Sequence, residues 1–144
     1  MIRYLLDVNV LIALLWEDHE SHARVQSWFR RTGAKSFATC ALMQAGFVRI
    51  VSNPRFSTAA VTVREAQEML TIVGRLEGHA FWPMNIGFPE TSAPFTHKLF
   101  GHRQVSDAYL LGLAIKEKGS LATLDHGFVA LAGDEFAKHV TLLA

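Results

Sequence analysis

Short apolar runs alternate with amphipathic helical segments along the whole chain, and this alternation constrains the fold more than any other feature. Strands of a parallel sheet are buried on both faces, so they read as short, nearly continuous apolar runs. Successive parallel strands also need a crossover connection, which is usually a helix. No linker, low-complexity run or internal repeat interrupts the pattern. We therefore predict one α/β domain over residues 1–144, with a parallel sheet of four to five strands covered by helices on both faces.

Apolar periodicity and local start and stop signals predict the individual elements. Strands are expected at residues 3–6, 36–39, 80–82, 121–124 and 140–143, the last at an edge of the sheet. Helices are expected at residues 8–16, 21–31, 41–52 and 104–118. A further helix follows the capping box Thr62-x-x-Glu65, carries an apolar stripe and ends by Gly78; the stripe comprises Val63, Ala66, Leu70 and Val73. Residues 83–103 hold three of the four prolines and form the longest expected loop.

Composition excludes several classes of protein. Half of the 144 residues are hydrophobic and 19% are charged, which is typical of a folded domain rather than a disordered chain. The apolar runs are broken well short of the roughly 18 residues of a membrane span, and Asp7 argues against a secretory signal. The single cysteine, Cys40, excludes an internal disulfide and fits a reducing cytoplasm, where we expect the protein. The net charge of +1 and the lack of a basic block mean that an RNA partner would need a local patch or a metal.

Four polar positions interrupt the apolar pattern in a coordinated way. Asp7 and Asp125 each directly follow an apolar strand, at the edge where open α/β sheets place their ligands. Asp107 heads a helical stripe of apolar residues, and Gln44 heads another. The first turn of a crossover helix lies beside the carboxyl end of the preceding strand. We therefore expect all four side chains to converge on one rim of the sheet.

Each aspartate also has a purely structural interpretation. Asp107 can cap its helix, Asp7 can belong to a turn, and Asp125 can begin the turn that follows it. Three carboxylates in one partly buried rim repel one another, however, and each is costly to desolvate without a cation. No lysine or arginine stands at matching positions, so the pattern favours a divalent metal held by Asp7, Asp107 and Asp125. Oxygen ligands are typical of Mg²⁺ or Mn²⁺.

Four further residues are candidates for supporting roles. Asn9 either orients an aspartate or caps the first helix, and Thr123 either orients an aspartate or simply belongs to its strand. His102 and Arg103 precede Asp107 and are candidates for substrate contact from the loop.

The residues of the rim, taken together, resemble the PIN-domain family. The resemblance is carried by residues 6–14 (Leu-Asp-Val-Asn-Val-Leu-Ile-Ala-Leu), 106–111 (Ser-Asp-Ala-Tyr-Leu-Leu) and 122–128 (Ala-Thr-Leu-Asp-His-Gly-Phe). Residues 46–54 (Gly-Phe-Val-Arg-Ile-Val-Ser-Asn-Pro) are similar to the version found in VapC-type toxins of bacterial toxin–antitoxin pairs. The likeness spans nearly the whole chain.

The resemblance implies a three-layer α/β/α sandwich, an Mg²⁺- or Mn²⁺-dependent endoribonuclease, a homodimer, and inhibition by a small antitoxin protein. It matches Asp7, Asp107 and Asp125 to the family's acidic metal site. Gln44 stands where the family usually has glutamate, so one charge is missing from the expected set. Gln44 keeps an oxygen that can bind a metal or a water, and we include it among the candidate catalytic residues.

Hydrolysis of an RNA phosphodiester is the predicted reaction, with the metal polarising a phosphate oxygen and acidifying a bound water. Two alternatives remain open. A haloacid-dehalogenase-like phosphatase also uses aspartates at this edge, but it has a second acid in an Asp-x-Asp motif, where this chain has Asn9. A nuclease weakened by Gln44 could instead serve as a binding protein.

Overall fold

Five short strands, all parallel, form the centre of the computed structural model, which describes all 144 residues. The strands are β1 (Tyr4–Leu6), β2 (Phe37–Thr39), β3 (His79–Phe81), β4 (Ser120–Thr123) and β5 (Val140–Leu142). Their order across the sheet is β3-β2-β1-β4-β5, and Leu6 pairs with Ala122 where β1 meets β4. The predicted parallel sheet, with residues 140–143 at one edge, is confirmed.

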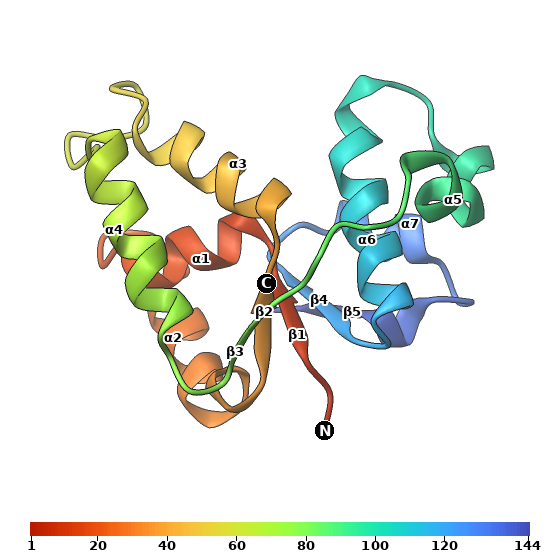
Figure 1. The fold of residues 1–144 in the computed structure, drawn as a ribbon, viewed down its shortest axis with the longest axis horizontal. Coiled ribbons are helices and arrows are strands. Elements are labelled where there is room, and N and C mark those ends of the chain that lie inside the picture. The colour runs from red at the N-terminus through yellow and green to blue at the C-terminus, as the bar shows by residue number, and fades with distance from the viewer.

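Helices cover both faces of this sheet (Figure 1). They are α1 (Val8–Leu15), α2 (His22–Arg31), α3 (Ala41–Val51), α4 (Val63–Gly74), α5 (Phe88–Ser92), α6 (Val105–Lys116) and α7 (Gly127–Ala132). Helices α1 to α4 pack together on one side, and α5, α6 and α7 pack on the other. Short 3₁₀ helices lie at Gly33–Lys35, Ala93–Lys98, His102–Gln104 and Ala137–His139. The three-layer α/β/α arrangement agrees with the expectation. None of these helices has the length and apolar character that a membrane span requires.

The central strands are fully buried because both of their faces are covered by helices. Leu5, Leu6, Ala38, Leu121 and Ala122 have no exposed surface. The apolar runs that predicted the sheet are therefore the middle layer of a 30-residue hydrophobic core. The one cysteine is buried in this core as well, and burial raises the pKa of its thiol.

The chain reverses its direction of travel across the sheet between β1 and β4. From β1 it builds outward through β2 and β3, and it then crosses to β4 and continues to β5. Such a reversal leaves a crevice beyond the carboxyl ends of the two strands, where α/β proteins bind their ligands. Asp7 follows β1 and Asp125 lies just beyond β4, so topology brings both to this crevice.

Four predicted details of the helices were wrong. The capping box at Thr62 and Glu65 is present, but Val63 is 53% exposed and α4 ends at Gly74. Gly78 is instead needed because a Cβ there would collide with the carbonyl of Ala34. The expected loop at 83–103 contains α5 and two 3₁₀ helices, and α7 was not predicted. Short helices of this kind have too few residues to show a periodic apolar stripe.

Candidate active site

Asp7 is fixed at the junction of β1 and α1. Its backbone N–H donates to the carbonyl of Ala122 at 2.9 Å, which continues the β1–β4 ladder by one residue. Its Oδ1 accepts a hydrogen bond from the backbone N–H of Val8 at 2.8 Å, so the carboxylate also caps α1. The side chain is only 8% exposed. Asp7 therefore has a structural role in addition to the metal-binding role proposed below.

Thr123 connects two of the aspartates. Its hydroxyl donates to Oδ2 of Asp7 at 2.7 Å and accepts from the backbone N–H of Asp125 at 3.0 Å. Thr123 thus orients an aspartate, which is one of the two roles that the sequence left open for it, and its own side chain has no exposed surface. Because both Asp7 oxygens are hydrogen-bonded, the carboxylate has a single defined orientation.

Asn9 and the Asp125 turn complete this edge of the sheet. Asn9 accepts from the backbone N–H of Leu124 at 3.2 Å, which ties the start of α1 to the end of β4. It does not cap α1, since Asp7 occupies that position. Asp125 is exposed, and its Oδ1 accepts from the backbone N–H of Gly127 at 2.8 Å. The turn that the sequence suggested after Asp125 is therefore formed.

Asp107 is half-buried in the first turn of α6 and shows the clearest electrostatic effect. Burial and, to a smaller extent, the charges of Asp7 and Asp125 together raise its pKa from 3.8 to about 6. Burial likewise raises the pKa of Asp7; hydrogen bonds from Thr123 and Val8 oppose that rise, and the charge of Asp125 adds to it. The three carboxylates are close enough to perturb one another.

A cavity of about 470 Å³ lies between α3 and α6, and we call it the α3–α6 cavity. Asp7, Asp107, Ser106 and Arg49 are its polar lining residues, and Leu42 and Met43 belong to its apolar wall. No three acidic, histidine or cysteine side chains are close enough to enclose a cation as they stand. Binding one would therefore require the carboxylates to move together. Arg49 was not singled out from the sequence, although it is a charged residue within a largely apolar helix.

Gln44 is not among the residues that line this cavity, and its amide donates to a threonine of β2 where we expected a contact with an aspartate or a metal-bound water. Its Nε2 donates to Thr39 Oγ1 at 3.1 Å, and that hydroxyl is 2.7 Å from His79 Nε2. Burial, and then the charge of Arg3, lower the pKa of His79, which favours a neutral ring that can accept from Thr39. The stripe headed by Gln44 includes buried Phe47, whose ring packs on Trp16 just after α1, while the opposite face of α3 lines the cavity. Sequence periodicity identified a buried face but not what that face contacts.

His102 and Arg103 also lie elsewhere. Both are exposed, and they line a separate hollow with Phe100 and Gln104 rather than the α3–α6 cavity.

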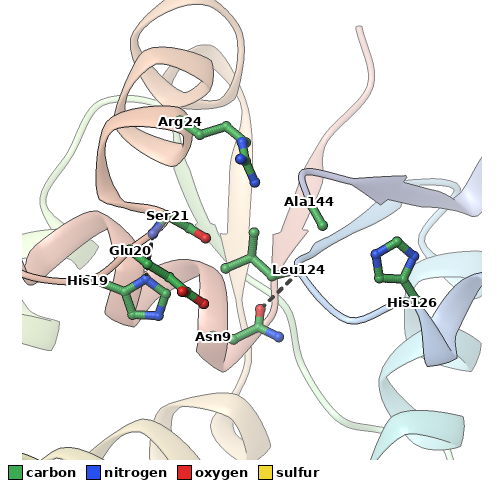
Figure 2. A pocket seen from close by; sticks show the side chains of 8 residues that line it. All are labelled: Asn9, His19, Glu20, Ser21, Arg24, Leu124, His126 and Ala144. Atoms are coloured by element: carbon green, nitrogen blue, oxygen red, sulfur yellow. Dashed lines mark hydrogen bonds between the residues drawn. The ribbon is translucent and has the colours of Figure 1, made fainter.

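A second cavity, of about 490 Å³, was not expected from the sequence. Asn9 and Leu124 line it, and Arg24 is among its other polar lining residues (Figure 2). No motif or spacing in the sequence indicated this cavity.

A family model described as the PIN domain matches residues 4–134. The chain belongs to the PIN-domain family. Ribonuclease VapC38 of Mycobacterium tuberculosis is 37% identical to this PIN domain over 139 residues, which are 96% of each chain. Ribonuclease VapC39 of the same species is 39% identical over 139 residues, covering 96% of this chain and 98% of the relative. Ribonuclease VapC44 is 36% identical over 130 residues, with 90% and 91% covered.

Solved structures share the fold of this PIN domain at low sequence identity. FitAcB from Neisseria gonorrhoeae superposes with a TM-score of 0.67 at 19% identity and 97% coverage of both chains. VapBC2 from Rickettsia felis, bound to a fragment of promoter DNA, gives a TM-score of 0.65 at 13% identity and 98% coverage of both. These likenesses confirm the three-layer PIN-like fold.

Proposed function

We propose that this PIN domain is a metal-dependent endoribonuclease that hydrolyses RNA phosphodiester bonds at the carboxyl edge of its sheet. The observation that carries the proposal is the environment of Asp107, beside Asp7 in one cavity, where burial and the charges of Asp7 and Asp125 raise its pKa to about 6. Relatives named as VapC ribonucleases, similar along nearly the full length of the chain, support it. The α3–α6 cavity beside two of these acids leaves space for a substrate.

Asp7, Asp107 and Asp125 are the residues that we propose to hold Mg²⁺ or Mn²⁺. Carboxylate oxygens are the ligands that both ions prefer, and a cation would relieve the repulsion among the three acids. Such an ion, when bound, supplies positive charge for the phosphate oxygens and acidifies a coordinated water. The chemistry of the donor set therefore fits the ion that the family resemblance implies, and the carboxylates would move together to bind it.

Hydrogen bonds from neighbouring residues orient the aspartates. Thr123 and the backbone of Val8 fix the orientation of Asp7, while the Gly127 N–H holds Asp125. Asn9 joins the two strand ends on which these aspartates depend. We propose that Thr123 and Asn9 are positioning residues that keep the carboxylates in place as substrate enters.

Cleavage of a labelled single-stranded RNA, with Mn²⁺ or with EDTA, tests the proposal. We expect wild-type protein to cut only with metal, and Asp7→Asn, Asp107→Asn and Asp125→Asn each to lose activity while remaining folded. Asp134→Asn, which removes one exposed charge outside the site, is the matched control. Full activity in Asp125→Asn would overturn the metal assignment. Release of phosphate from a small phosphomonoester, without RNA cleavage, would support the phosphatase alternative instead.

We also propose that the protein forms a homodimer and is inhibited by a small antitoxin, as a VapC-type toxin. Helix α4 and the segment after it expose Val63, Ile72 and Leu76, apolar side chains that suit a protein partner. A basic antitoxin side chain has a complementary target in the acidic rim. Light scattering that shows a strict monomer at micromolar concentrations contradicts the dimer. An antitoxin that binds without reducing RNA cleavage contradicts the inhibitory role.

If the protein binds Mn²⁺ and RNA but never cuts, it is the binding protein considered as an alternative. Titration calorimetry with Mn²⁺ separates that outcome from a failed metal site. Wild-type protein should bind the ion, and Asp7→Asn should bind it more weakly, because each lost carboxylate removes Coulomb attraction.

A further inference from the structure

Two cavities flank the acidic rim, and each contains one permanently charged cation. The α3–α6 cavity, which Asp7 and Asp107 line, contains Arg49. The second cavity, which we call the α1–α2 cavity, is lined by Asn9, two residues beyond Asp7, and by Leu124, one residue before Asp125. Its cation is Arg24. The proposed scissile position therefore lies between two cavities, one lined mostly by apolar residues and the other mostly by polar ones.

The α1–α2 cavity is predominantly polar. Figure 2 shows Arg24 reaching in from α2, with His19 and His126 on opposite sides and Asn9 below. Arg24 donates one long hydrogen bond, from Nη1 to the Leu143 carbonyl at 3.5 Å. A guanidinium has five N–H donors in a planar fork that matches phosphate oxygens, so most of its donors remain available.

We propose that a single RNA strand crosses the acidic rim from one cavity to the other, with Arg24 and Arg49 binding the phosphates on either side of the scissile one. This inference rests on the proposed ribonuclease function. Each cavity, at about 490 and 470 Å³, is within the range of about 300–1,000 Å³ typical of sites that enclose a small ligand. The space is therefore sufficient for one nucleotide on each side.

The nearly neutral chain has few positive charges near the acidic rim that could bind RNA phosphates, and Arg24 and Arg49 are two of them. The whole chain has a net charge of +1 and no basic block, and the rim itself brings three carboxylates together. RNA affinity depends largely on cations that neutralise phosphates, so a few well-placed arginines must supply it here. Arg24 and Arg49 are the only lysine or arginine residues among those that line the two cavities. Glu20 also lines the α1–α2 cavity, so the attraction for a phosphate there depends on Arg24.

The salt dependence of RNA binding measures this contact directly. For a single strand, each neutralised phosphate makes the slope of log K against log salt more negative by about 0.7. We expect Arg24→Gln and Arg49→Gln each to make the slope shallower by about 0.7, and the double variant by about 1.4. The loss should be similar for RNAs of different sequence, because phosphate contacts carry no base information.

The experiment uses fluorescence anisotropy of a labelled single-stranded RNA in EDTA, so that binding is measured without cleavage, beside cleavage assays with Mn²⁺. Arg64→Gln, which removes the same charge from exposed α4, is the matched control. Arg103→Gln should also behave like that control, since Arg103 lines neither cavity.

The outcomes separate the two proposals. A wild-type protein that fails to cut RNA overturns the proposed function. A wild-type protein that cuts RNA, with Arg24→Gln and Arg49→Gln matching Arg64→Gln in slope, overturns only the strand path. Wild-type protein that cuts but shows no binding in EDTA at low salt also overturns the path, because the arginines then hold no phosphate.

Discussion

Replacing Asp107 with asparagine should stabilise the metal-free protein. Burial, together with the charges of Asp7 and Asp125, raises the pKa of Asp107 from 3.8 to about 6. Between these pH values the folded protein holds a proton that the unfolded chain has released, so the free energy of unfolding falls as pH rises through this window. Above about pH 6 the penalty is fully present, and Asp107→Asn removes it while keeping the shape of the side chain.

The size of the effect follows from the pKa. A rise from 3.8 to about 6 corresponds to an upper limit of about 3 kcal/mol. Asp107 is only half-buried and water screens part of the repulsion, so we expect about 1–2 kcal/mol. For a domain of this length, that gain raises the unfolding midpoint by about 3–8 °C.

Differential scanning calorimetry in EDTA, at about pH 7.5 and about pH 4, measures the change. The gain of Asp107→Asn over wild type should be present at the higher pH and nearly vanish at the lower one. Asp134→Asn, an exposed control, should leave the midpoint unchanged at both. Added Mn²⁺ should raise the midpoint of wild type more than that of the variant. An unchanged or lower midpoint for Asp107→Asn at about pH 7.5 would refute the argument that burial and the neighbouring carboxylates penalise the charged form of Asp107.

Three further predictions concern residues around the site and in the core. Thr123→Val removes a buried hydrogen bond to Asp7 and should lower the free energy of unfolding by about 1–3 kcal/mol, measured by urea denaturation. Gln44→Glu should leave Mn²⁺ affinity unchanged in titration calorimetry because the side chain binds Thr39 and does not line the α3–α6 cavity; a clear gain in affinity would return Gln44 to the site. Gly112→Ala places a Cβ against backbone of α5 and should destabilise by about 1–3 kcal/mol, whereas Gly101→Ala, which meets nothing within 4 Å, should be nearly neutral in thermal unfolding.

The sheet was predictable because its strands leave a direct record in the sequence. A strand buried on both faces must be apolar throughout, and that requirement applies wherever the strand sits in the sheet. The same requirement made Asp7 and Asp125 conspicuous at the ends of two such runs. Asp107 was equally visible as a charge at the head of an apolar helical stripe. Local periodicity thus determined the layer architecture and the three acids.

The surroundings of those acids depended on contacts between distant segments, which only the tertiary structure decided. Periodicity showed that Gln44 belongs to a buried face of α3, but not that Gln44 would bind Thr39 or that Phe47 on the same face would pack on Trp16. The positions of Arg24 and Arg49 in the two cavities could not be predicted for the same reason, because residues far apart in the chain line each cavity. A side chain's burial is recorded in its local pattern, whereas its neighbours are set by how helices pack on the sheet.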